Sequence, residues 1–143
     1  MENQVFFTIL SGTLVFVIGQ IVQRFLLEPI KEYKKIVGTI DNKLKYYSNI
    51  LTNTIFSQDK KMLVEITDVM RGLSCDIESA YKQIPLTKGL SKLKFIETKE
   101  EIADVAQGLI FLSNVGGRDE SRIDKCDERI NEIRKHLKIE SLN

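Results

Sequence analysis

The N-terminal stretch of the chain has a hydrophobic pattern that no other part of it shares. No charged side chain lies between Asn3 and Gln23, and the 18 residues from Val5 to Val22 are mostly apolar. At 1.5 Å per residue they would form a helix about 27 Å long, close to the thickness of the hydrocarbon core of a bilayer. The pattern predicts a transmembrane helix, and we expect residues 1–27 to form a membrane anchor.

Two other interpretations of this stretch compete with the anchor. A cleaved signal peptide begins with basic residues and ends at a site of small residues. This chain instead begins Met1-Glu2-Asn3-Gln4 and continues from the apolar stretch into Arg24 and Phe25. A core helix of a soluble protein seldom runs so far without a charge. We therefore favour the anchor.

The cations around the segment predict its orientation. No Lys or Arg precedes it, and four follow it closely: Arg24, Lys31, Lys34 and Lys35. Because cytoplasmic flanks carry the excess of positive charge, we expect the N-terminus outside and residues 28–143 in the cytoplasm. Cys75 and Cys126 would then stand in a reducing compartment, where free thiols are expected rather than a disulfide.

Small residues recur along one side of the predicted span. They are Thr8, Ser11, Gly12 and Gly19. Such a face lets a second helix approach closely, which would allow self-association or pairing with a partner. The alternative is that small residues are simply frequent in membrane helices.

Pro29 follows directly after the span. Proline removes one helical hydrogen bond and restricts the residue before it, here Glu28. We expect a kink or hinge where the chain leaves the bilayer.

Beyond Pro29 the apolar residues recur every three or four positions, which is typical of amphipathic helices. A first stripe comprises Ile36, Ile40, Leu44, Tyr47, Leu51 and Ile55. A second, ended by Pro85, comprises Met62, Ile66, Val69, Leu73, Ile77, Ala80 and Ile84. The break between them is expected at Ser57–Asp59.

Two further helices are predicted in the last third of the chain. Thr98 and Glu101 have the spacing of a capping box, which would begin a third helix. Asn114 fits its C-terminal end better than a buried position that fixes helix register, and Gly116–Gly117 would stop it. The fourth helix would begin near Asp119 and carry Ile123, Cys126, Ile130, Ile133 and Leu137. We expect an all-α fold, in which the anchor holds an antiparallel, up-and-down bundle of about four cytoplasmic helices.

The connector between the second and third helices is apolar and basic. It holds several leucines together with Lys88, Lys92 and Lys94. In an up-and-down bundle it returns to the membrane, where its composition suits an interfacial segment on anionic lipid. The alternative, which we favour by a small margin, is a solvated loop whose leucines cover the end of the bundle core.

The net charge and the reactive side chains exclude few classes of function. The net charge of +1 is too small to indicate a nucleic-acid partner. His136 is the one histidine, and two cysteines 51 residues apart are poor material for a zinc site. The carboxylates of the last helix alternate with Arg and Lys, which indicates a solvated face of ion pairs rather than a cation site. We expect no catalytic residue, cofactor, metal or small-molecule substrate.

Several short motifs spread over nearly the whole chain carry a resemblance. They are Leu27-Glu28-Pro29-Ile30, Tyr46–Asn49, Ile84-Pro85, Thr98–Ile102, Leu109–Asn114 and Ile130–Leu137. With them the chain resembles a family of small bacterial proteins that have one N-terminal membrane helix, a helical cytoplasmic part and no assigned function. The resemblance implies a bacterial protein of the inner membrane.

These observations favour a membrane-anchored interaction or scaffold module, whose bundle binds a protein partner or copies of itself. An oligomeric membrane effector or toxin-like protein, gated by its bundle, is the alternative. An enzyme with an unrecognised helical site is the third hypothesis.

Overall fold

The computed structural model describes residues 2–52, 60–114 and 120–139, and within these ranges it contains helices and no strand. The predicted all-α class is confirmed for this part of the chain. The expected breaks at Ser57–Asp59 and Gly116–Gly117, and the expected helix start at Asp119, lie outside the described residues.

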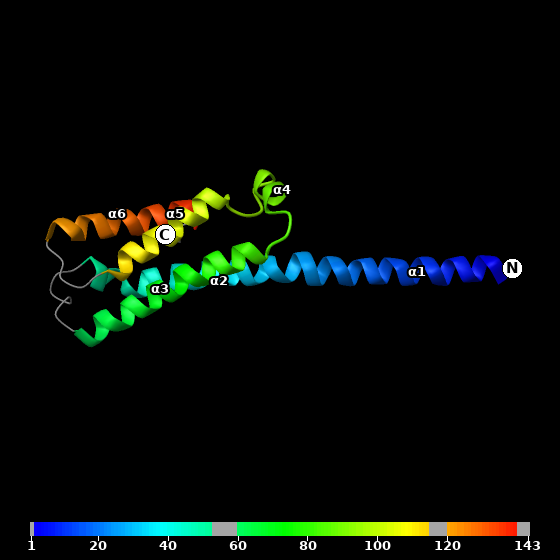
Figure 1. Ribbon diagram of the computed structural model, residues 1–143, viewed down its shortest axis with the longest axis horizontal. Coiled ribbons are helices and arrows are strands. Elements are labelled where there is room, and N and C mark those ends of the chain that lie inside the picture. Colours follow the sequence, from blue (N-terminus) through cyan, green and yellow to red (C-terminus); the bar gives the residue numbers. More distant parts are fainter. Residues whose placement is uncertain (1, 53–59, 115–119, 140–143) are drawn as a thin grey trace.

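The N-terminal part of the chain is one long helix (Figure 1). It consists of α1 (Glu2–Val22), a π-helical turn η1 (Gln23–Leu27) and α2 (Glu28–Leu51). Figure 1 shows α1 projecting away from the other helices as a rod. Every side chain from Gln4 to Val22 is exposed.

The π-helical turn lies immediately before Pro29. Proline has no N–H, and its ring crowds the carbonyl four residues earlier, here that of Phe25. In η1 the backbone hydrogen bonds span five residues instead of four: the N–H of Glu28 donates to the carbonyl of Gln23. Pro29 itself stands in the first turn of α2, so the helix widens there but does not stop. Hinge motion at Pro29 stays a prediction.

Four of the described helices pack around a shared core, and the described residues between 28 and 139 are here called the helical domain. The four helices are α2, α3 (Lys60–Gln83), α5 (Lys99–Ser113) and α6 (Glu120–His136). Helix α3 packs between α2 and α5, and α6 closes the ring against α5 and α2. The fully buried side chains include Ile40, Leu44, Tyr47, Ile66, Met70, Ile77, Leu109, Leu112 and Ile130. The predicted stripes thus supply much of the core, but the buried Met70 lies outside them, and the predicted Met62 and Val69 are only partly buried.

The predicted limits of α5 are confirmed. The Thr98 hydroxyl accepts from the Glu101 N–H at 3.2 Å, and a Glu101 carboxylate oxygen accepts from the Thr98 N–H at 2.7 Å. The backbone hydrogen bond from Thr98 is the main cause that lowers the pKa of Glu101. At the other end, Asn114 is the exposed C-cap residue.

The connector contains a short helix, α4 (Thr87–Lys92), where the sequence pattern indicated none. Figure 1 shows α4 at the end of the helical domain from which α1 departs. Leu90 packs against the core, whereas Leu86 and Leu93 are exposed. The expectation that the leucines cover the core therefore holds for Leu90 and is wrong for the other two.

Close contact between α5 and α6 depends on Gly108. A Cβ atom there would lie 2.9 Å from Cγ1 and 3.0 Å from Cδ1 of the buried Ile133. We expect Gly108→Val to lower the free energy of unfolding by ~1–3 kcal/mol, because the larger side chain overpacks the contact.

The matched control is Gly72→Val in α3, because a Cβ atom at Gly72 would meet nothing within 4 Å. That change should stay within ~0.5 kcal/mol. Denaturant unfolding of the full chain in mild detergent, followed by circular dichroism, measures both. Equal losses in the two variants would contradict the packing described.

Candidate membrane-proximal site

The continuous helix Gln4–Leu51, which contains most of α1, is the one helix of the described residues that is long and apolar enough to cross a membrane. The few hydroxyl groups of α1 are bonded within the helix. Thr8 donates to the carbonyl of Gln4, Ser11 to that of Thr8 and Thr13 to that of Ile9, each at 2.9 Å. Such bonding removes most of the cost of placing a hydroxyl in an apolar solvent.

The predicted helix-packing face lies along α1. Thr8, Ser11, Gly12 and Gly19 are all exposed. A Cβ atom at Gly12 or Gly19 would meet nothing within 4 Å in the single chain. The face is open to a second helix, and pairing through it stays a prediction.

The predicted basic residues gather near the junction of α1 and α2. Arg24 lies in η1, Lys31, Lys34 and Lys35 lie in the first turns of α2, and all four are exposed. Lys88 and Lys92 in α4 and Lys94 just after it are exposed as well. Since α4 lies at the end from which α1 departs, the structure brings the two sets to the same end of the helical domain (Figure 1).

A buried polar network, which the sequence analysis missed, ties the elements of this end together. The Tyr33 hydroxyl from α2 donates to the carboxylate of Glu97, and the Tyr81 hydroxyl from α3 donates to the backbone carbonyl of Glu97 at 3.1 Å. The two rings meet edge to face at 6.0 Å between centroids. Lys138, after α6, places its Nζ 3.9 Å from the Glu97 carboxylate.

Both tyrosines of this network are held in the protonated form. Burial, followed by the hydrogen bond and charge of Glu97, raises the pKa of Tyr33 far above its ordinary value. Burial also raises the pKa of Tyr81. Protonated hydroxyls are the donors that the Glu97 oxygens require, so the arrangement serves as a clamp between α2, α3 and the end of the connector.

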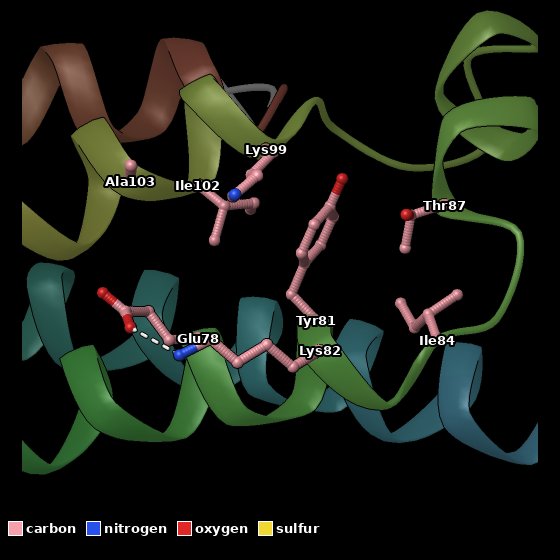
Figure 2. A pocket seen from close by; sticks show the side chains of 8 residues that line it. All are labelled: Glu78, Tyr81, Lys82, Ile84, Thr87, Lys99, Ile102 and Ala103. Atoms are coloured by element: carbon pink, nitrogen blue, oxygen red, sulfur yellow. Dashed lines mark hydrogen bonds and ion pairs between the residues drawn. The ribbon is translucent and has the colours of Figure 1, made fainter.

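A cavity of about 410 Å³ lies beside this clamp, between α3, α4 and α5. Figure 2 shows Tyr81 and Ile102 as apolar walls and Thr87 across the space from Lys99. The Lys82 ammonium lies 3.2 Å from the Glu78 carboxylate, drawn as the dashed line. The lining is therefore mixed, with apolar walls, one ion pair and the side chain of Lys99.

The other candidates for chemistry lie apart from this clamp. His136 Nε2 is 3.9 Å from the Asp104 carboxylate, and Arg129 pairs with Glu132 at 2.7 Å. Among the residues that the structure describes, no group of three or more His, Cys, Asp or Glu could hold a metal ion. Cys75 is exposed and Cys126 is buried, and the two are not joined in a disulfide.

Comparison with known proteins found no family model, curated protein or solved structure that matches the chain. The resemblance to small bacterial membrane proteins therefore stays a prediction. What the structure defines is an all-helical protein with one candidate transmembrane helix among the residues described.

The clamp can be tested with Tyr33→Phe, which leaves the buried Glu97 carboxylate without that donor. We expect a loss of ~1–3 kcal/mol in the free energy of unfolding. Tyr46→Phe is the control, because Tyr46 is exposed, and it should change stability by less than ~0.5 kcal/mol. Denaturant unfolding of the two variants beside the parent chain measures the difference.

The same variant predicts a change at alkaline pH. Tyr33 has a raised pKa when folded, so above pH ~10 the unfolded chain releases a proton that the folded chain keeps. The contribution of the Tyr33 hydroxyl to the free energy of unfolding is complete below pH ~10, and it falls as the pH rises further. Urea unfolding between pH ~8 and ~11 should show a shallower decline for Tyr33→Phe, and an unchanged decline would refute the clamp.

Proposed function

We propose that this protein is a single-pass, membrane-anchored interaction module. In this proposal α1 spans the inner membrane of a bacterium, with the N-terminus outside. Helices α2, α3, α5 and α6 form an antiparallel, up-and-down bundle in the cytoplasm, which binds a protein partner or other copies of the chain.

The observation that carries the proposal is the apolar surface of α1, which no other part of the described chain covers. Large exposed side chains run along it from Val5 to Val22, among them Phe6, Phe7 and Phe16. Soluble monomers rarely expose contiguous apolar patches of this extent. A bilayer is a cover that fits both the length of the stretch and the internal bonding of its hydroxyls.

The proposed role in binding is supported by the division of the chain. The helical domain has a core of its own, to which α1 contributes no residue. Such a domain does not need α1 for its packing, so α1 is available to hold it at the membrane. Tethering raises the local concentration of whatever the domain binds without any new contact.

The continuous helix through η1 favours a second candidate. Because α1 and α2 share one backbone helix, a movement of the bundle could be transmitted to the span. An oligomeric membrane effector gated by its bundle would use such a connection.

The two native thiols provide a test of the anchor and its sidedness. In intact cells a membrane-impermeant maleimide should leave Cys75 unlabelled, and it should label Cys75 once the inner membrane is opened. Cys75→Ser should abolish the label, because Cys126 is buried. Labelling in intact cells with a permeable outer membrane would contradict the orientation, and recovery of the protein in the soluble fraction would contradict the anchor.

The binding role predicts that the protein is part of a larger assembly. Crosslinking in native membranes and light scattering in mild detergent should give a mass above 16.4 kDa, that of one chain. If pairing uses the face of α1, Gly12→Leu should reduce the assembly at least several-fold, whereas Gly38→Leu on the open side of α2 should not. A chain that remains a monomer in both measurements would exclude the proposed role.

A further inference from the structure

The segment Leu86–Phe95, here called the foot, exposes large apolar side chains beside cations. Leu86 is 77% exposed, Leu93 68% and Phe95 62%. Lys88, Lys92 and Lys94 lie between them, and the foot contains no Asp or Glu. Exposed apolar side chains are costly in water, and apolar side chains interleaved with cations suit the boundary of an anionic bilayer.

The backbone holds the foot in a defined shape. Leu86 and Lys94 flank α4 and have φ values of 56° and 58°. Residues other than glycine rarely adopt this left-handed backbone conformation. After α4 the N–H of Lys94 donates to the carbonyl of Ser91, and that of Phe95 to the carbonyl of Leu90, each at 3.0 Å. These two bonds form a Schellman motif that ends the helix.

Buried residues fix the foot at both ends. Ile84 precedes it and Ile96 follows it, and both lie in the core. Beyond Ile96, Glu97 is held by Tyr33 and Tyr81. Leu90 in the middle packs against the core. The exposed apolar side chains are therefore displayed on a fixed segment.

The position of the foot indicates which surface it contacts. It lies at the end of the helical domain from which α1 departs (Figure 1). The exposed cations Arg24, Lys31, Lys34 and Lys35 lie near the same junction. If α1 spans a bilayer, which is the proposed function on which this inference rests, that end faces the lipid surface.

We propose that the foot lies in the interface of an anionic bilayer. Leu86, Leu93 and Phe95 enter the boundary of the acyl chains, and Lys88, Lys92 and Lys94 contact the phosphates of the headgroups. The lysines favour lipid over a protein partner, because the centres of protein interfaces are depleted in lysine. The domain thereby gains a second attachment and a fixed orientation on the membrane.

The test places a fluorescent reporter in the foot. The chain has no Trp, so Phe95→Trp, here called the foot reporter, introduces a single indole at an exposed position. The matched control reporter is Val64→Trp, at a position 60% exposed near the start of α3, the helix that ends at the foot. Both full-length variants are placed in nanodiscs of phosphatidylcholine, with or without about a third of phosphatidylglycerol, each containing brominated acyl chains.

Bromine should quench the foot reporter at least twofold more than the control reporter in the anionic nanodiscs. Quenching should be weaker in phosphatidylcholine, because each lysine strengthens adsorption to an anionic surface roughly fivefold. The double change Lys88→Ser and Lys92→Ser should therefore weaken the docking of the foot reporter to the anionic membrane by roughly 25-fold. Lys60→Ser with Lys125→Ser, both exposed lysines outside the foot, should leave it unchanged.

Three results would overturn the inference. The first is that bromine quenches the foot reporter no more than the control reporter. The second is that the quenching of the foot reporter is the same in anionic and in neutral nanodiscs. The third is that its indole becomes shielded from water only as the protein concentration rises, which would indicate contact with a second copy. Failure of the anchor is seen separately, because the chain would then not elute with the nanodiscs at all. Circular dichroism of each variant checks that the helices have formed.

Discussion

The arrangement of this molecule depends on how the apolar surface of α1 is removed from water. The helical domain forms its core without α1, and the exposed side chains of α1 run along the helix from Val5 to Val22. Bringing such a surface into an apolar solvent is favourable by roughly 25 cal/mol for each Å². Summed over a span of this length, the preference is larger than the stability of most small domains. The proposed anchor follows from it, and the proposed orientation and foot both require that anchor.

The Tyr33, Tyr81 and Glu97 clamp connects that constraint to the rest of the fold. Tyr33 lies just after the span, Tyr81 at the end of α3 and Glu97 at the end of the connector. A single buried carboxylate residue thus fixes the start of α2 relative to α3, and it holds the base of the foot.

Periodicity and local motifs predicted much of this structure. The stripes that contain Ile40, Ile66 and Ile130 supply much of the core, and the Thr98 capping box begins α5. These features depend on residues a few positions apart, so a single sequence records them. The clamp joins Tyr33 to a residue 64 positions away, and no local pattern signals such a pair.

Two further differences have local causes. A helix was not expected at Thr87–Lys92, because Lys94 occupies the left-handed position that glycine usually takes after a helix. The π-helical turn Gln23–Leu27 next to Pro29 was not expected either, and the kink or hinge expected at Pro29 stays a prediction.

Sedimentation velocity of the full-length protein after complete removal of detergent tests the central claim most directly. If α1 requires lipid, the chain will form large aggregates of many sizes, and it will return to a single species when phospholipid nanodiscs are supplied. A monodisperse 16.4 kDa particle that persists in plain buffer would show that α1 tolerates water, and would contradict the account.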